Sequence, residues 1–231
     1  MLTAPLLALV AVIIKVVTPG PVLFSQVRVG RGGDTFRLHK FRTMVPDADK
    51  LGSSVTSGQD PRITPLGKWL RKTKIDEIPQ LWNVVKGDMS LVGPRPEVPE
   101  VVAMYTLKMR QILKFRPGLT SVASLELHRE EELLDLSANP DDAYVRIFVP
   151  TKVASAMSVA LSPSFVYDLQ ILVSTAWVLT LGRMFKHQDN ELDSFIRRAL
   201  EEYSRDRPDI SGKQLLDSWR ELPDSIRNQI L

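Results

Sequence analysis

The stretch KTKIDEIPQLWNVVKGDMSLVGPRP, Lys72 to Pro96, is the most constrained part of the chain. Two adjacent acids, Asp76 and Glu77, follow a basic stretch, and the rigid turn Gly-Pro-Arg-Pro closes the segment. If a short helix follows the acids, Pro79 fits only its first turn, because proline lacks the N–H that later turns require. The acids are then expected near a helix N-terminus, where backbone N–H groups favour anions.

Adjacent carboxylates beside cations suit chemistry on a phosphate group. One acid can attack phosphorus, and the other can help to hold a divalent cation that neutralises the phosphate oxygens. An acid pair alone is more often a solvated surface feature, and Gly-Pro-Arg-Pro alone is compatible with an ordinary rigid turn. The combination at short spacing is what indicates a site.

The two motifs lie within a longer run that resembles the bacterial sugar transferases, the monotopic phosphoglycosyl transferases. Upstream, the resemblance includes TPGPVLFSQVRVGRGGDTFRLHKFRTM, Thr18 to Met44, and downstream it reaches FRPGLT, Phe115 to Thr120. It covers roughly residues 5 to 120 in order. The family usually continues with a Gly-Trp-Ala-Gln-like segment, where this chain has SVASLE. Acceptor or sugar specificity is therefore expected to differ.

The resemblance implies a two-step transfer of a sugar 1-phosphate, which starts the assembly of a polysaccharide or glycan. A UDP-sugar binds with Mg²⁺, Asp76 attacks the phosphorus next to the sugar, and UMP leaves. A polyprenol phosphate, undecaprenyl phosphate, then takes the phosphosugar from Asp76. Asp76 is implied to be the nucleophile, and Glu77, together with Asp76, is implied to hold the metal. A carboxylate can serve because phosphoryl transfer depends chiefly on positioning and charge neutralisation.

Four basic residues are candidates for binding the diphosphate. Lys40 and Arg42 are two residues apart, so they share one side of the chain if their segment is a strand. Without the resemblance, two solvated cations on an exposed face would be an equally good interpretation. Arg95 lies between two prolines that fix φ, which prepares a planar donor for phosphate. Arg116, before a Pro-Gly pair, is a weaker candidate of the same kind.

Composition limits the kinds of site and partner. The chain has 231 residues and no cysteine, so disulfides and thiolate sites are excluded. With only three histidines, any metal is expected to be a hard cation such as Mg²⁺ on carboxylate oxygens. Residues 15–116 hold eighteen Lys and Arg against nine Asp and Glu, which suits anionic lipid or a phosphorylated substrate. No nucleic-acid-binding motif is found, so no nucleic-acid partner is expected.

The apolar run Pro5 to Val17 is the first segment with a membrane signal. Its thirteen residues would span about 20 Å as a helix, short of the ~30 Å hydrocarbon core. Alone it fits a buried core helix, an interfacial helix or half of a re-entrant hairpin. The resemblance favours a re-entrant helix whose entering half is missing, on the cytoplasmic face of the bacterial inner membrane. No signal peptide is evident.

The expected fold class is α/β or α+β, with a small sheet wrapped by helices, some of them amphipathic at the membrane interface. We predict a hairpin of two extended segments, 22–29 and 35–44, followed by a polar loop over 46–65. Three helical segments are predicted at 66–72, 97–114 and 141–185. Further expectations concern single residues: Leu66, Trp69 and Leu70 inward on the first helix, Val101, Tyr105, Met109 and Ile112 on one face of the second, breaks at Pro150 and Pro163 in the third, and Trp82 in the core.

Three regions are expected along the chain: a membrane-helix remnant over 1–17, a catalytic domain over 18–185 and a helical appendage over 186–231. The apolar run Leu169 to Leu181 fits either the core or the membrane interface. Arg183 and Lys186 just beyond it would suit lipid phosphates. The sequence does not decide whether the chain forms a homo-oligomer.

Two other function classes remain open. The first is a non-catalytic or impaired family member that serves as a membrane-associated scaffold, suggested by the missing helix half and by the altered segment after Thr120. The second is a Mg²⁺-dependent phosphohydrolase that forms an aspartyl phosphate. Whether UMP release requires a polyprenol phosphate separates these classes from the transferase.

Overall fold

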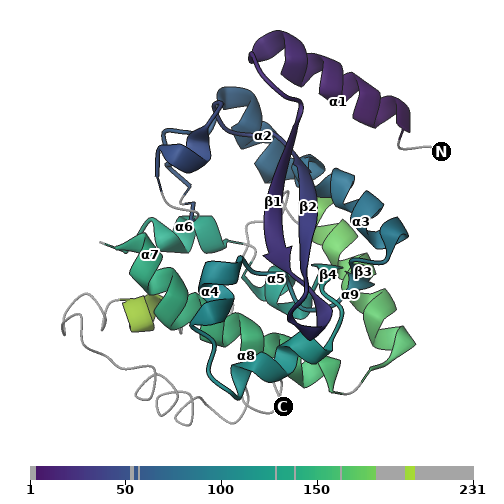
Figure 1. Cartoon of the computed structure of the whole chain (residues 1–231), viewed down its shortest axis with the longest axis vertical. Coiled ribbons are helices and arrows are strands. Elements are labelled where there is room, and N and C mark those ends of the chain that lie inside the picture. Colours follow the sequence, from purple (N-terminus) through teal and green to yellow (C-terminus); the bar gives the residue numbers. More distant parts are fainter. Residues whose placement is uncertain are drawn as a thin grey trace.

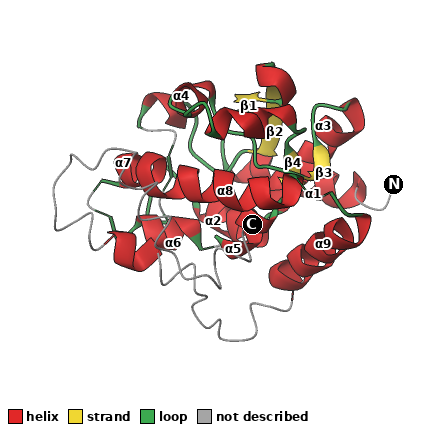
Figure 2. Ribbon diagram, turned by 90° about the horizontal axis from the view of Figure 1, so that it is seen from below, coloured by secondary structure: helices red, strands yellow, loops and turns green. Residues whose placement is uncertain are grey.

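The computed structural model describes residues 4–52, 55–56, 58–127, 129–137, 139–161, 163–180 and 196–200. Helices surround two small two-stranded sheets (Figures 1 and 2), which confirms the expected class of a small sheet wrapped by helices. Within the described residues, no helix is both long enough and apolar enough to cross a membrane.

A β-hairpin forms the centre of the fold. Strands β1 (Leu23–Val29) and β2 (Thr35–Phe41) pair antiparallel around a short turn, η1 (Arg31–Gly33). Gly32 and Gly33 both have positive φ in this turn, a conformation that glycine adopts without steric cost. The hairpin predicted from the alternating pattern is therefore confirmed.

Helix α1 (Ala4–Val17) lies across one end of the hairpin (Figure 1). Its inner side buries Val10 and Ile14 against Phe41 of β2 and Leu70 of helix α2 (Pro65–Thr73). Its outer side leaves large apolar side chains exposed: Leu9, Val12, Val16 and Val17. The packing of α1 is therefore one-sided.

The acid pair lies on a short 3₁₀ helix, η3 (Ile75–Gln80), which packs on β2. Lys74, in the left-handed region at φ 55°, makes the sharp turn from α2 into η3. The prediction of one helix after the acids is corrected, because η3 precedes a separate helix, α3 (Leu81–Lys86). Pro79 donates no N–H and disfavours α geometry in the residue before it, so regular α-helix begins only at Leu81.

A pair of glycines joins the Gly-Pro-Arg-Pro turn to the rest of the fold. Strands β3 (Ser90–Val92) and β4 (Gly118–Thr120) pair in parallel, and Gly93 crosses directly over Gly118. A Cβ on Gly118 would clash with the backbone of Gly93. The crossing therefore requires glycine at this position.

The larger core lies among the helices between the Gly-Pro-Arg-Pro turn and Ala160. These are α4 (Pro99–Ala103), η4 (Met109–Lys114), α5 (Val122–Glu126), α6 (Glu130–Leu134), α7 (Pro140–Ala143), the π-helical segment η5 (Tyr144–Phe148) and α8 (Val149–Ala160). Their buried side chains include Val101, Ile112, Leu133, Ile147, Phe148 and Val153.

Two of the predicted helices are corrected. The predicted helix over 97–114 is divided into α4 and η4, although its expected face is buried or packed against the core. The Arg110 side chain donates to the carbonyls of Ala103 and Tyr105, which satisfies acceptors that the interruption frees. Pro150 does not break the third helix, because it occupies the first turn of α8, where proline is tolerated.

The surface differs from prediction at the tryptophans. Trp69 and Trp82, expected in the core, are 53% and 63% exposed.

Helix α9 (Phe165–Thr180) follows the predicted break at Pro163 and buries Ile171, but most of its large apolar side chains are exposed. Arg183 and Lys186 lie outside the described residues. Of the region 186–231 only residues 196–200 are described, so the division into three regions stays a prediction.

Candidate active site

The two acids of η3 are buried. Asp76 is 5% exposed and Glu77 is 9% exposed. The solvated-surface interpretation of the pair is therefore wrong. Their burial follows from the packing of η3 on β2 and on α2, which places this turn inside the fold.

Glu77 is neutralised by two of the predicted cations. Lys40 Nζ donates to Glu77 Oε1 at 3.1 Å, and Arg95 Nη2 donates to the same oxygen at 2.8 Å. Burial alone would raise the pKa of Glu77, but the positive charges of Arg95 and Lys40 outweigh it and hold the pKa well below the usual range. Glu77 is therefore an ionised carboxylate with its charge matched by both partners.

Asp76 has a different environment one residue away. Its Oδ1 atom is buried and accepts no hydrogen bond from the part of the chain that the structure describes. Burial raises the pKa of Asp76 above its usual value, with a smaller opposing effect of Lys40 and a further increase from Glu77. An oxygen without hydrogen bonds, on a carboxylate held at raised pKa, retains more of its nucleophilic character.

The backbone around Arg95 is held from both sides. Gly118 N donates to Pro94 O at 2.9 Å, and Arg28 Nη1 donates to Pro96 O at 3.1 Å. The ion pair with Glu77 raises the pKa of Arg95 still further above its ordinary value. Burial lowers the pKa of Lys40, against the opposing effect of Glu77.

The structure does not bring Arg42 and Arg116 to this cluster. Arg42 follows the end of β2, and its guanidinium donates to the carbonyls of Thr18 and Pro19. Arg42 thereby fixes the turn between α1 and β1, where Gly20 has a positive φ and a Cβ would meet the Arg42 guanidinium. Arg116 has an exposed side chain. Their roles in substrate binding stay predictions.

A second buried polar network lies behind Arg95 and was not predicted from the sequence. Glu97 Oε1 accepts a hydrogen bond from the Tyr144 hydroxyl at 2.7 Å, and Glu97 Oε2 lies 3.4 Å from Arg28 Nη1. Lys152 Nζ lies 3.2 Å from that hydroxyl and 2.7 Å from Glu130 Oε2. The network ties the Gly-Pro-Arg-Pro turn to η5 and α8. Sequence spacing gave no signal for it, because its members come from five separate segments.

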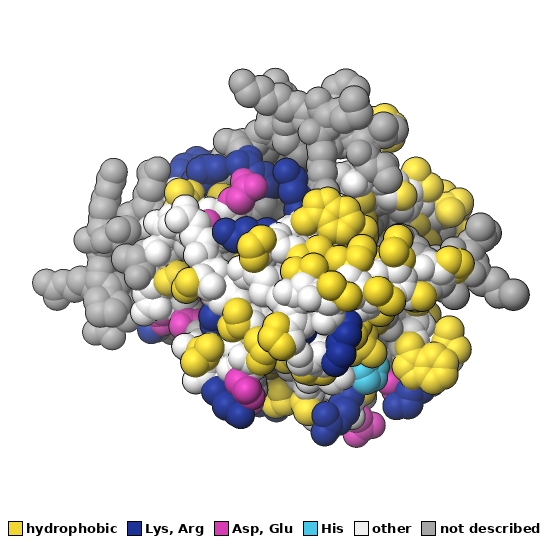
Figure 3. All heavy atoms as spheres, turned by 90° about the horizontal axis from the view of Figure 1, so that it is seen from above, with side chains coloured by type: hydrophobic (Ala, Val, Ile, Leu, Met, Phe, Trp, Pro, Cys, Tyr) yellow, Lys and Arg dark blue, Asp and Glu magenta, His cyan; other side chains and the backbone are white. Residues whose placement is uncertain are grey.

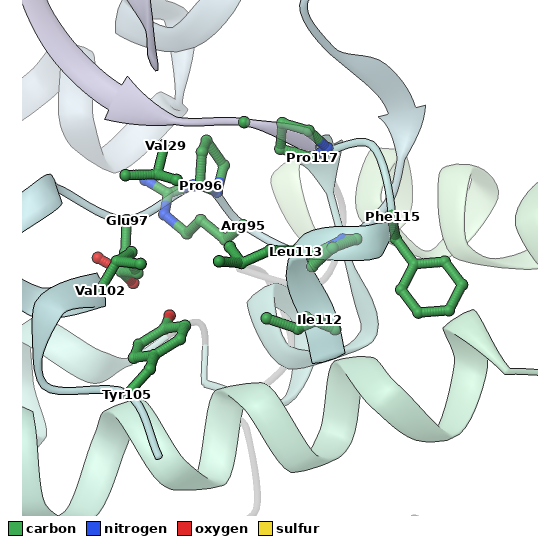
Figure 4. A pocket seen from close by; sticks show the side chains of 12 residues that line it. Val29, Arg95, Pro96, Glu97, Val102, Tyr105, Ile112, Leu113, Phe115 and Pro117 are labelled. Carbon is green, nitrogen blue, oxygen red and sulfur yellow. The ribbon is translucent and has the colours of Figure 1, made fainter. Parts of the chain in front are cut away.

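A small pocket lies beside Arg95, and Glu97 of this network also lines it (Figure 4). Its lining includes Val29, Pro96, Tyr105, Ile112 and Phe115. Its volume is about 20 Å³, enough for about one water molecule and far below the size of a nucleotide-sugar site. A donor is therefore expected to reach Asp76 from another side.

The acid pair fits Mg²⁺ through a small number of carboxylate oxygens. The described part of the chain holds no group of three His, Cys, Asp or Glu side chains that could enclose a metal ion. Asp76 Oδ1 accepts no hydrogen bond from the described residues, and Glu77 Oε2 has a 3.4 Å contact with Arg95 Nη1, whereas Glu77 Oε1 accepts from both Lys40 and Arg95. Mg²⁺ is commonly held by one or two carboxylates, waters and substrate phosphates, and the Asp76 oxygen suits that arrangement.

Comparison with known proteins adds a family match. The family model described as "Bacterial sugar transferase" matches residues 1–182. A putative undecaprenyl-phosphate N-acetylgalactosaminyl 1-phosphate transferase of Bacillus subtilis is 50% identical over 116 residues, which cover 50% of this chain and 61% of that protein. A UDP-N-acetylgalactosamine-undecaprenyl-phosphate N-acetylgalactosaminephosphotransferase of Aeromonas hydrophila is 40% identical over 151 residues, 63% of this chain and 34% of that protein.

The exopolysaccharide production protein PSS of Rhizobium leguminosarum is 37% identical over 190 residues, which cover 79% of this chain and 90% of that protein. The chain thus spans less than two thirds of the length of the first two relatives and most of the length of the third.

Proposed function

The chain belongs to the bacterial sugar transferase family, and from this membership we propose that it transfers a sugar 1-phosphate from a UDP-sugar to undecaprenyl phosphate. The observation that carries the chemical part of the proposal is the contrast within η3. Asp76 presents a buried oxygen that no described residue hydrogen-bonds, next to a glutamate that two cations neutralise. The names of two relatives supply the sugar-phosphate donor and acceptor classes.

In the first step, an oxygen of Asp76 attacks the β-phosphorus of the UDP-sugar. The bond between that phosphorus and the bridging oxygen breaks, its electron pair leaves with UMP, and the phosphosugar remains on Asp76 as an acyl phosphate. Glu77 fixes Lys40 and Arg95, which can then stabilise charge on the diphosphate. Asp76 is 5% exposed, so we expect donor binding to widen the approach to it.

In the second step, a phosphate oxygen of undecaprenyl phosphate attacks the same phosphorus. The bond to Asp76 breaks, and the carboxylate is restored as polyprenol-diphosphate sugar forms. Mg²⁺ held by Asp76 and the substrate phosphates would neutralise charge on the phosphate oxygens when bound. Glu77 would join it through Oε2, which lies 3.4 Å from Arg95 Nη1.

The acceptor places the proposed reaction at a membrane. Figure 3, which looks onto the end of the molecule that carries α1, shows a broad gathering of hydrophobic side chains. Exposed apolar residues of α1 contribute to the surface of the molecule. We propose that α1 lies in the membrane interface on the cytoplasmic side of the bacterial inner membrane, without crossing the bilayer.

The test is UMP release from a panel of UDP-sugars with Mg²⁺ and undecaprenyl phosphate in detergent. We expect multiple-turnover release from one donor that depends on the acceptor and is lost in Asp76→Asn. Label on the β-phosphate should remain on wild-type protein before acceptor is added, and none should remain on the variant. Asp34→Asn, the same chemical change at an exposed position of the hairpin turn, serves as the matched control.

Three results would contradict the proposal in different ways. Native turnover by Asp76→Asn would exclude the covalent step. Undiminished UMP release without polyprenol phosphate would favour a phosphohydrolase. Donor binding without UMP release from any UDP-sugar would favour a non-catalytic scaffold.

A further inference from the structure

Gln80, the last residue of η3, is a buried amide without a described hydrogen-bond partner. It is 2% exposed, and its Nε2 atom has no partner within the described residues. A buried donor without a hydrogen-bond partner costs free energy. Buried amides in native proteins are rarely left in this state without a reason.

The position of Gln80 relates it to the acid pair. Side chains three residues apart eclipse in a 3₁₀ helix, so Gln80 follows Glu77 on the buried face of η3. Asp76, four residues before Gln80, carries the other buried side-chain atom of this helix without a partner, Oδ1. One short helix thus holds a buried acceptor and a buried donor that have no partner among the described residues.

Asn83 shows that the same region can satisfy a buried amide. It is 0% exposed and lies three residues beyond Gln80. Its Nδ2 donates to Arg37 O at 2.7 Å and to Asp88 Oδ2 at 3.2 Å, and its Oδ1 accepts from His39 N at 3.2 Å. Asn83 therefore has the contacts of a structural amide, whereas the donor of Gln80 remains available to a ligand.

We infer that the Gln80 amide donates a hydrogen bond to a non-bridging oxygen of the β-phosphoryl group, the group that Asp76 attacks. A phosphoryl group suits both residues, because its phosphorus is the electrophile that the Asp76 oxygen would attack and its oxygens accept N–H donors such as the Gln80 amide. A neutral amide also suits this position, since it does not form an ion pair that would quench the Asp76 carboxylate. This inference rests on the proposed function.

UDP and UMP distinguish the inferred contact, because only UDP carries a β-phosphate. Calorimetric titration of the full chain in detergent with Mg²⁺ would give both dissociation constants. Gln80→Leu should weaken UDP binding about tenfold, which corresponds to ~1.4 kcal/mol, and leave UMP binding within about twofold of wild type. Gln111→Leu, the same change at an exposed position of η4, should alter neither constant.

Thermal unfolding shows whether a loss of binding results from unfolding of the variant. Removing an unsatisfied buried amide should leave the melting temperature unchanged or raise it. Gln80→Met, which keeps the unbranched shape, is the second variant. If both variants fail to fold, the amide is structural and the inference is wrong.

The remaining outcomes separate this inference from the proposed function. If wild type releases UMP and binds UDP, while Gln80→Leu binds UDP equally well, the inference alone is overturned. An equal loss of UDP and UMP binding would also overturn it, because the contact would not be to the β-phosphate. If wild type neither binds UDP nor releases UMP, the proposed function fails and the inference fails with it.

Discussion

At the scale of single residues, the fold gives two neighbouring acids opposite electrostatic environments. Burial holds the pKa of Asp76 up, whereas Arg95 and Lys40 overcome the same effect at Glu77 and hold its pKa down. Paired titratable groups whose pKa values are pushed apart commonly divide their roles in a reaction. This division supports the proposed roles, attack by Asp76 and the ordering of cations by Glu77.

The raised pKa of Asp76 predicts a change of stability that runs opposite to the change of activity. A carboxyl whose pKa is higher in the folded than in the unfolded protein stabilises the fold when protonated, and this contribution is lost as pH rises through the folded-state pKa. At neutral pH the ionised Asp76 therefore costs stability, chiefly because it is buried. Asp76→Asn should abolish UMP release and raise the melting temperature, by about 2–4 °C for each 1 kcal/mol recovered.

The pH dependence of this gain provides the check. Calorimetric melting at a series of pH values should show the largest gain near neutral pH, and the gain should shrink as acid protonates Asp76 in the wild-type protein. Asp34→Asn, at an exposed position, should show no such trend. A lower melting temperature for Asp76→Asn at neutral pH would instead mean that attraction to Lys40 exceeds the cost of burial.

At the scale of elements, local sequence predicted the hairpin, the short helix before the acids and the burial of one face over 97–114. These features depend on turn residues and on periodicity, both of which are local. The sequence did not predict the contacts that complete the site. Arg42 resembled a phosphate ligand because of its spacing from Lys40, but its place just after β2 directs its guanidinium to the turn after α1.

Gln80 and the network around Glu97 were missed for a related reason. A single glutamine in a sequence does not indicate a site. Gln80 becomes a candidate only because the structure buries it and its Nε2 has no hydrogen-bond partner among the described residues. The network extends from Arg28 to Lys152, so no spacing rule could group its members. Trp69 was predicted to face inward with Leu66 and Leu70, and Trp82 was predicted in the core, although the positions of α2 and α3 that carry them are exposed.

The crossing of Gly93 over Gly118 predicts the behaviour of the element that holds Arg95. A Cβ on Gly118 would meet the backbone of Gly93, and backbone moves less readily than a side chain. Gly118→Ala should therefore reduce the free energy of unfolding by about 3 kcal/mol, the upper part of the usual cost of overpacking, and should weaken UDP binding by displacing Arg95. Urea unfolding and calorimetry measure the two effects.

Gly52→Ala is the matched control for this change. A Cβ on Gly52 would meet only the Arg62 side chain, which can move. If the free energy of unfolding of Gly118→Ala is close to that of wild type, β3 and β4 separate at little cost. The constraint on the Arg95 turn is then weaker than the packing implies.

At the scale of the whole molecule, charge and apolar surface are distributed unevenly. Residues 15–116 carry about nine excess positive charges, and this region contains both the acid pair and the cations around it. Helix α1 adjoins it and packs on the hairpin and α2 with one side only. A basic region beside a one-sided apolar helix suits a surface of anionic lipid, because both attractions then act at once.

This arrangement predicts that α1 contributes directly to membrane binding. Val12 and Val16 are 60% and 80% exposed on its outer side. Each valine that enters the interface contributes roughly 1.5 kcal/mol, so the double variant Val12→Ser with Val16→Ser should bind anionic vesicles at least about tenfold more weakly in flotation assays. Leu107→Ser, at an 85% exposed position between α4 and η4, should bind as wild type does. Equal loss in both variants would assign binding to general hydrophobicity, and unchanged binding in the α1 variant would remove α1 from the interface.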